Sequence, residues 1–451
     1  MRRARLADCI LAGAAALIAL SAVRGLALWR ALRAHGASDP RLTAALAVAV
    51  LLAAALLAAL ALPRPRRVNL ALALVSGVFA LYVGELALAA QALTPRRLRE
   101  KLALLERYAA AGRPASPGVE PVRFMWIRPA DDPQWLEIGG RPTLPLGGIA
   151  RRLTVDCKEG GDWMVFETDE HGFNNPPGLW AEPSLDLAFL GDSFVHGSCV
   201  RAEETLVARV RARHPATLGL AMPGSGPLTM LATLREYLPA LRPRTVLWCY
   251  YPGNDLLDLR RERGHPLLPA YLEAGHAQGL AAEQPALDRA LQDFVDARLL
   301  PHVRHMASLR PDLVGALALR EVRARAGLAL AEPYALAPTE DELALFARVL
   351  REARATVSGW GGRLVFVYLP AWPEPARQLG EKEYARGKEE TARRVRALVA
   401  EMGLPLVDVE AAFRRDPQAE GLYACPGCHY SPAGYALAAR AVLATLDGAA
   451  P

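Results

Sequence analysis

The sequence offers few residues that could bind a metal ion. It has nine histidines and six cysteines in 451 residues. His302 and His305 stand three positions apart, but no acidic residue or cysteine accompanies them at a ligand spacing. Cys425 and Cys428 form a Cys-Pro-Gly-Cys pair that lacks the two further ligands of a zinc site. We therefore expect a solvated helix face at the two histidines, and a function that uses neither a metal ion nor a cofactor.

A basic surface for nucleic acid is also missing. The net charge of +6 comes mostly from arginines that flank apolar runs near the N-terminus. Arginines in such places interact with lipid headgroups at a membrane surface. The charge therefore predicts a lipid bilayer as a partner and gives no reason to expect nucleic acid.

Three apolar runs fill the N-terminal region, residues 1–94. The run at 42–62 is long enough to cross a bilayer. The runs at 9–29 and 68–93 contain polar residues, which would have to face neighbouring helices or the membrane interface. We predict three transmembrane helices, with a buried or interfacial helix as the alternative for the two outer runs. A cleaved signal peptide is disfavoured, because apolar character resumes twice downstream.

The rest of the chain divides into a connecting region and a larger domain. The arginines do not fix the membrane orientation, because either orientation places nearly as many of them in the cytoplasm. We expect residues 95–143 to form an amphipathic stalk helix and a linker rich in Pro, Gly and Asp. We expect 144–451 to form one folded domain, with a small β element at 144–180 and a helical insertion at 256–338.

A Gly-Asp-Ser turn at 191–193 is the centre of this domain. It follows the apolar run 185–190, which predicts a buried strand, and precedes a predicted helix at 203–213. A strand that ends in such a tight turn lifts a hydroxyl above the edge of the sheet. Ser193 is therefore the candidate nucleophile, and it needs a base and an oxyanion hole from elsewhere in the chain.

Three later stretches supply candidates for those roles. Gly224 lies in a Pro-Gly-Ser-Gly-Pro loop after the apolar segment 216–222, where a glycine can bring its N–H close to a bound ester. Asn254 follows the apolar run 245–251 and could donate from its side-chain amide. His429 stands just before a predicted helix start and could act as the base.

In this order the four residues resemble the SGNH, or GDSL-type, hydrolase family, in its membrane-anchored bacterial subset. The resemblance implies that Ser193 is the nucleophile and His429 the general base. It also implies that Gly224 and Asn254 donate to the oxyanion beside the Ser193 N–H, and that the substrate is an ester.

One position departs from the family pattern. The family places an Asp three residues before the His, and this sequence has Pro426 there. One alternative is a Ser-His dyad in which a backbone carbonyl orients the imidazole. The other is that a different carboxylate, such as Asp408 or Asp416, takes the role. The sequence leaves both open.

Apolar runs alternate with helical patterns through the domain. Predicted strands lie at 184–190, 216–221, 244–251, 363–369 and 404–409. Predicted helices lie at 203–213, 228–240, 340–359, 384–402 and 432–446. Such alternation indicates a parallel sheet covered on both faces. We therefore predict an α/β fold with a doubly wound, five-stranded parallel sheet of flavodoxin-like type, whose site lies at the carboxyl ends of the strands.

A Thr-Asp-x-x-Gly-Phe-x-Asn segment upstream of the turn is similar to one found in some bacterial SGNH proteins. We expect it to pack a small β element against the catalytic sheet; the alternative is that His171 or Asn175 lines the pocket. If it packs there, Cys157 and Cys199 are candidates for a disulfide that ties this element to the site. Such a bond makes sense only in an oxidising compartment, which favours a periplasmic domain on the bacterial inner membrane.

Cys425 and Cys428 have two interpretations, a small loop disulfide or a redox pair. The sequence does not indicate an oligomeric state. The leading functional hypothesis is a membrane-anchored serine esterase that removes an acyl group, typically O-acetyl, from an envelope or extracellular glycan. The alternatives are an O-acyltransferase acting on a polysaccharide and a non-catalytic glycan-binding scaffold of an export system.

Overall fold

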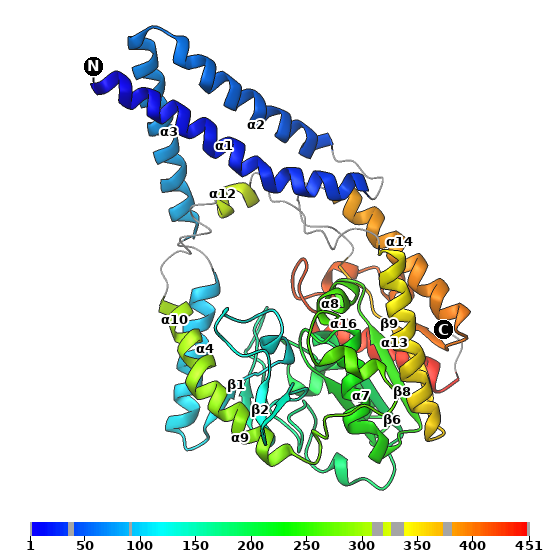
Figure 1. Ribbon diagram of the computed structural model, residues 1–451. Coiled ribbons are helices and arrows are strands. Elements are labelled where there is room, and N and C mark those ends of the chain that lie inside the picture. The colour runs from blue at the N-terminus through cyan, green and yellow to red at the C-terminus, as the bar shows by residue number, and fades with distance from the viewer. Residues whose placement is uncertain are drawn as a thin grey trace. The chain divides into compact units, whose positions relative to one another are not determined.

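The computed structural model describes residues 2–34, 40–89, 93–308, 319–325, 338–372 and 381–448. They form two compact units (Figure 1). One unit comprises Met1–Arg96, Ser308–Ala337 and Glu374–Glu390, and the other comprises Arg97–Ala307, Pro338–Pro373 and Thr391–Pro451. The first unit carries the apolar N-terminal helices, and the second carries a parallel sheet.

Three long apolar helices build the first unit: α1 (Arg2–Ala34), α2 (Pro40–Ala58) and α3 (Arg64–Ala89). Stretches long and apolar enough to cross a membrane lie at Arg5–Ala27, Leu42–Ala61 and Arg64–Leu88. Large apolar side chains such as Leu51 and Phe79 are exposed on these helices. Contact of such an apolar surface with lipid is favourable, whereas its exposure to water is unfavourable.

Glu85 is an acidic residue within the apolar helix α3, and it finds partners far along the chain. Its carboxylate accepts hydrogen bonds from the backbone N–H groups of Glu321 at 3.0 Å and Val322 at 2.9 Å. Both belong to the first turn of α12 (Arg320–Arg325), where N–H groups have no partner inside the helix. Packing between helices thus satisfies the polar group that the apolar run contains.

The second unit is built on five strands: β6 (Leu187–Gly191), β7 (Thr217–Ala221), β8 (Thr245–Tyr250), β9 (Arg363–Tyr368) and β10 (Leu406–Asp408). Their order is β10-β9-β8-β6-β7, and every neighbouring pair is parallel. Strand β7 lies on one side of β6 and strand β8 on the other, so the order in which strands are added to the sheet reverses at β6. In doubly wound folds this reversal opens a crevice at the carboxyl ends of the strands. The predicted α/β fold is confirmed.

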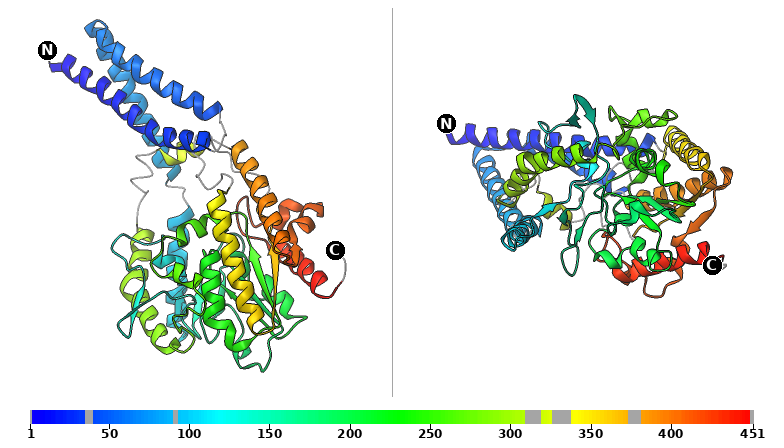
Figure 2. Two further views of the ribbon diagram at one scale, coloured as in Figure 1. Left: turned by 45° about the vertical axis from the view of Figure 1, so that its right-hand side comes forward. Right: turned by 90° about the horizontal axis from the view of Figure 1, so that it is seen from below.

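Helices cover both faces of the sheet (Figure 2). Those that lie in this unit or extend into it are α4 (Leu93–Ala110), α5 (Ser193–His196), α6 (Leu206–Arg211), α7 (Pro227–Leu241), α8 (Asp255–Glu262), α9 (Gln284–Phe294), α10 (Leu300–Ser308), α13 (Glu340–Gly359), α14 (Glu381–Glu401), α15 (Val409–Arg415) and α16 (Pro432–Leu446). The predicted helices correspond to α6, α7, α13, α14 and α16. The one-turn helix α5 was not predicted, because four residues show no helical period.

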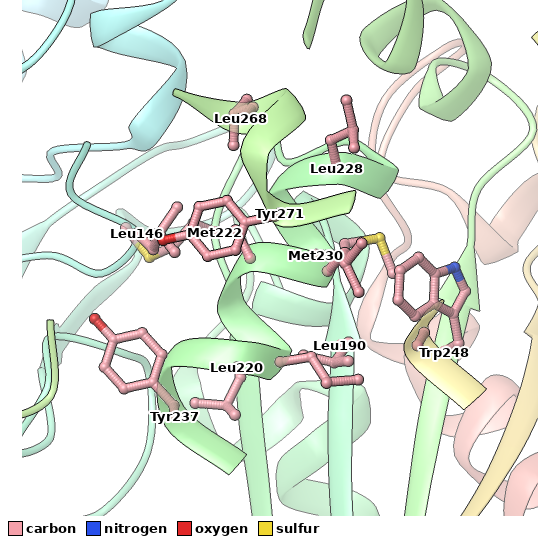
Figure 3. Close-up of a cluster of buried hydrophobic side chains, with 14 of the residues drawn as sticks. Leu146, Leu190, Leu220, Met222, Leu228, Met230, Tyr237, Trp248, Leu268 and Tyr271 are labelled. Atoms are coloured by element: carbon pink, nitrogen blue, oxygen red, sulfur yellow. The ribbon is translucent and has the colours of Figure 1, made fainter. Parts of the chain in front are cut away.

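Alternate residues of the strands enter two separate hydrophobic layers. Leu190 and Trp248 lie in the layer beneath α7 and α13 (Figure 3). Phe189 and Leu247, one position away on the same strands, lie in the opposite layer with α6 and α16. Each fully buried side chain of this size contributes roughly 1.5–3 kcal/mol to folding. This double burial is why the strands are apolar through most of their length.

A small three-stranded sheet precedes the main one. It joins β1 (Ala115–Pro117), β4 (Leu153–Val155) and β5 (Val165–Glu167), and a hairpin nearby in sequence joins β2 (Leu136–Ile138) to β3 (Arg141–Thr143). Strands β1 to β3 fall in the region expected to be stalk and linker. Strands of three residues are too short to show an alternating pattern, which explains the difference.

The Gly-Phe-Asn-Asn segment connects this small sheet to the main sheet. Asp169 accepts a hydrogen bond from the Asn175 amide at 2.8 Å. The Asn175 side chain also pairs with both the N–H and the C=O of Gly219 on the edge strand β7, at 2.9 and 2.8 Å. The His171 ring contacts Gln284 at 3.1 Å. These contacts support the packing interpretation and not the one in which His171 or Asn175 lines the pocket.

Candidate active site

Ser193 is the first residue of α5, directly after strand β6. The Asp192 carboxylate caps this short helix by accepting the N–H of Phe194 at 2.9 Å. Gly191 has no room for a side chain, because an added Cβ would lie 2.4 Å from Val195. The Gly-Asp-Ser residues therefore form the tight turn that presents the Ser193 hydroxyl at the sheet edge.

His429 reaches Ser193 from the loop before α16. Its Nε2 lies 2.8 Å from the Ser193 Oγ, a hydrogen-bonding distance. The loop is closed by a disulfide between Cys425 and Cys428, and Ser431 caps the helix that follows. Of the two interpretations of this cysteine pair, the structure has the loop disulfide.

Glu159 is the carboxylate that contacts His429, and the sequence analysis did not name this residue. Its Oε1 lies 2.8 Å from the His429 Nδ1, and its Oε2 accepts the backbone N–H of His429 at 2.7 Å. Asp408 instead pairs with Arg396 at 3.1 Å and caps α15. Asp416 accepts the N–H of the residue two positions later. Of the two alternatives, the structure has a different carboxylate at the imidazole, and that carboxylate is Glu159, whereas Asp408 and Asp416 bond elsewhere.

The charge state of Glu159 fits this position. Burial raises the pKa of the Glu159 carboxyl, but the hydrogen bonds and charge of His429 outweigh burial, so the pKa is lowered from its usual value. The carboxylate is thus ionised at neutral pH. A carboxylate at Nδ1 holds the proton on that nitrogen, which leaves the lone pair of Nε2 facing the Ser193 hydroxyl.

Gly224 and Asn254 lie in the loops that follow β7 and β8, the two strands beside β6. Gly224 has a φ of +76°, and an added Cβ would lie 2.9 Å from Val122, so only glycine fits. The Asn254 amide hydrogen-bonds Asp258 at 2.9 Å and also Asp192, whose pKa is raised by burial to about 6. It therefore lies against the nucleophile turn, as an oxyanion donor must.

Comparison with known proteins agrees with this geometry. Residues 189–437, more than half of the chain, match the model of the GDSL-like lipase/acylhydrolase family. The chain belongs to this family. It is therefore an ester hydrolase, and the predicted resemblance is confirmed. The comparison with curated proteins gave no match.

Solved structures of GDSL-type and related hydrolases are similar to this GDSL-like hydrolase at low identity. A lipase/acylhydrolase from Enterococcus faecalis is 14% identical, covers 58% of this chain and 96% of its own, and has a TM-score of 0.33. A lipolytic protein of the G-D-S-L family from Veillonella parvula is 11% identical, with coverage of 58% and 99% and a TM-score of 0.32. An alpha/beta hydrolase from the Lake Arreo metagenome is 15% identical, with coverage of 61% and 100% and a TM-score of 0.34.

A disulfide joins the acid loop of this GDSL-like hydrolase to its nucleophile loop. Cys157 and Cys199 are bonded, with their Cα atoms 5.0 Å apart. Glu159 is only two residues beyond Cys157, and Cys199 is six beyond Ser193. The bond therefore fixes the hairpin that carries the acid next to the residues that it serves. The Cys-x-Glu spacing, together with Pro426 at the usual acid position, was the sequence signal for Glu159.

One group of possible metal ligands lies in the described part of the chain, and it overlaps the site. Glu159, Cys199 and His429 each place a ligand atom within 4.8 Å of the others. Cys199 is in the disulfide and has no thiolate to offer. Glu159 and His429 already bond to each other. The chemistry of this set favours acid-base catalysis over metal binding.

Proposed function

We propose that this hydrolase uses a Ser193–His429–Glu159 triad to cleave an acyl ester, with the oxyanion bound by Ser193 N–H, Gly224 and Asn254. The observation that carries the proposal is the position of His429, at 2.8 Å from both the nucleophile and the acid. A chain of contacts in this order is what activates a serine.

The mechanism follows from these contacts. Ser193 Oγ attacks the ester carbonyl while its proton passes to His429 Nε2. Glu159 stabilises the imidazolium that forms, and the three donors stabilise the oxyanion. His429 then gives its proton to the leaving alcohol, and an acyl-enzyme remains. Water, activated by His429, releases the acid by the same steps.

The catalytic unit is proposed to lie outside the cytoplasm, anchored by the N-terminal helices. Two disulfides support this position, because they persist in oxidising compartments such as the periplasm. The chain has three helices long and apolar enough to cross a membrane, and an odd number of spans puts the two ends of a chain on opposite sides. An enzyme held there meets envelope and extracellular material, so we propose the O-acetyl group of a glycan as its substrate.

The test uses full-length protein in detergent. Wild type and Ser193→Ala are compared first on p-nitrophenyl acetate and then on an O-acetylated polysaccharide, with released acetate measured. A triad esterase loses nearly all activity in the variant. Equal rates for the two proteins on p-nitrophenyl acetate would refute the esterase mechanism. Activity on p-nitrophenyl acetate without acetate release from the polysaccharide would refute the glycan substrate alone. Acetate transfer to an added sugar, in place of release, would favour the acyltransferase.

A further inference from the structure

The loops that contain Gly224 and Asn254 share one support, the helix α8. Its residues Asp255, Asp258 and Glu262 are three and four positions apart and so lie on one face of the helix. All three are buried, with exposed fractions of 1%, 3% and 0%. The guanidinium of Arg261 lies beside this face, with its Nη1 3.4 Å from the Asp258 Oδ1. Burying a carboxylate costs free energy of desolvation unless hydrogen bonds or nearby charges compensate for it.

Glu262 holds the loop that contains Gly224. Its Oε1 accepts the N–H of Gly226 at 2.7 Å, and its Oε2 accepts the N–H of Leu228 at 2.8 Å. Pro227 between them has no N–H. The carboxylate thus satisfies free N–H groups at the start of α7, and fixes the loop from outside the helix.

Asp258 holds Asn254. Its Oδ2 accepts from the Asn254 Nδ2 at 2.9 Å. The Asn254 side chain makes no capping bond to its own helix, and its Oδ1 is buried with no hydrogen-bond partner in the described structure. The amide therefore takes its direction from two carboxyl groups, Asp258 on its own helix and Asp192 on the nucleophile turn.

We propose that Asp258 is a positioning residue of the oxyanion hole, which orients the Asn254 amide and works as a neutral carboxylic acid. The inference rests on the proposed esterase function. A neutral carbonyl oxygen accepts the amide N–H as a carboxylate does. A negative charge at this place would oppose the negative charge that develops on the substrate oxygen.

The groups around Asp258 favour its neutral form. Glu262 and Asp255 face it from its own helix, and Asp192 faces it from the nucleophile turn. Arg261 is the basic group beside it, whereas Arg260 bonds to Glu342 on α13. Burial, and next the charge of Glu262, raise the pKa of Asp258 to about 8. Burial also raises the pKa of Glu262 to about 7.

The experiment measures kcat and KM for p-nitrophenyl acetate from pH 6 to 10 with full-length protein in detergent. The variants are Asp258→Ala and Asp258→Asn, with Ser193→Ala as the blank at each pH. Asp293→Asn, an exposed change of the same charge on α9, is the matched control. Thermal melting of each variant reports folding.

We expect Asp258→Ala to lower kcat at least tenfold with KM within about twofold, because an oxyanion donor loses its orientation. Asp258→Asn keeps the neutral-pH rate and loses the decline in kcat near pH 8. Wild-type kcat in Asp258→Ala, or an unchanged alkaline decline in Asp258→Asn, would overturn the inference while the esterase stands. If Asp258→Ala does not fold, the pH profile of Asp258→Asn decides. A wild type no faster than Ser193→Ala would overturn both proposals.

Discussion

A Glu159→Gln variant keeps the size of the acid side chain and changes its hydrogen bonding. The carboxylate of Glu159 accepts two bonds from His429, one at Nδ1 and one at the backbone N–H. A glutamine amide has one oxygen and one NH₂ group, so it can accept only one of them. If its oxygen takes the backbone N–H, its NH₂ group faces Nδ1 and donates to it. The ring proton then moves to Nε2, where it blocks proton transfer from Ser193.

The size of the effect follows from this loss of tautomer and charge. A triad acid changed to its amide lowers kcat by about 10⁴ in serine hydrolases, which corresponds to about 5 kcal/mol in the transition state. Glu159→Ala leaves room for water at Nδ1 and does not force the wrong tautomer. We therefore expect Glu159→Gln to be slower than Glu159→Ala, an order that simple loss of a contact would not produce.

The assay is kcat on p-nitrophenyl acetate at pH 7.5, with Ser193→Ala as the blank. Glu167→Gln, an exposed glutamate on the same small sheet, is the matched control and should behave as wild type. Near-UV circular dichroism establishes that each variant keeps its tertiary packing. A Glu159→Gln enzyme within threefold of wild type would show that His429 works without this acid, and would return the dyad to consideration.

Three further outcomes follow from the same geometry. Gly224→Ala should lower kcat about 10²-fold with little change in KM, because its Cβ would lie 2.9 Å from Val122 and displace the N–H; steady-state kinetics would show it. Cys157→Ser should be about tenfold less active than oxidised wild type, because the hairpin that carries Glu159 is no longer tied to the nucleophile loop, and wild type should fall to the same rate on reduction. Equal rates for Cys157→Ser and oxidised wild type would contradict this. Asp258→Asn should melt higher than wild type at pH 9 and no higher at pH 4. The folded-state pKa of about 8 means that wild type loses stability as pH rises from the unfolded value of 3.8, at up to ~1.4 kcal/mol per unit.

The main sheet was predictable because its strands are buried on both faces. Runs such as the one that became β8 are apolar from their second residue onward, and the helical patterns between them indicate a parallel sheet. The small sheet was not predictable in the same way. Strands β1 to β5 have three residues each, too few to show a period, and β1 pairs with β4, which lies far from it in sequence.

The site residues also differ in how well the local sequence predicts them. Ser193, Gly224 and Asn254 each follow a strand directly, so the fold that the sequence predicts also brings them to one edge. His429 is predictable because it stands just before a recognisable helix start. Glu159 follows no strand end and no helix start, so its sequence signals are the weaker ones of Cys157 nearby and Pro426 at the usual acid position; it meets His429 across 270 residues of chain. Its role depends on tertiary packing that no periodic pattern encodes.

The position of the acid also explains the placement of the disulfides. An Asp three residues before the His would share one loop with it, and the chain itself would keep the two groups together. Here Glu159 stands on a separate hairpin. Fixing this hairpin beside His429 costs loop-closure entropy that a short connection within one loop would avoid. The Cys157–Cys199 bond, across a separation of 42 residues, removes part of that entropy from the unfolded and partly opened states. We therefore expect the proposed triad to be held most firmly when these cysteines are oxidised, which agrees with the proposed location in an oxidising compartment.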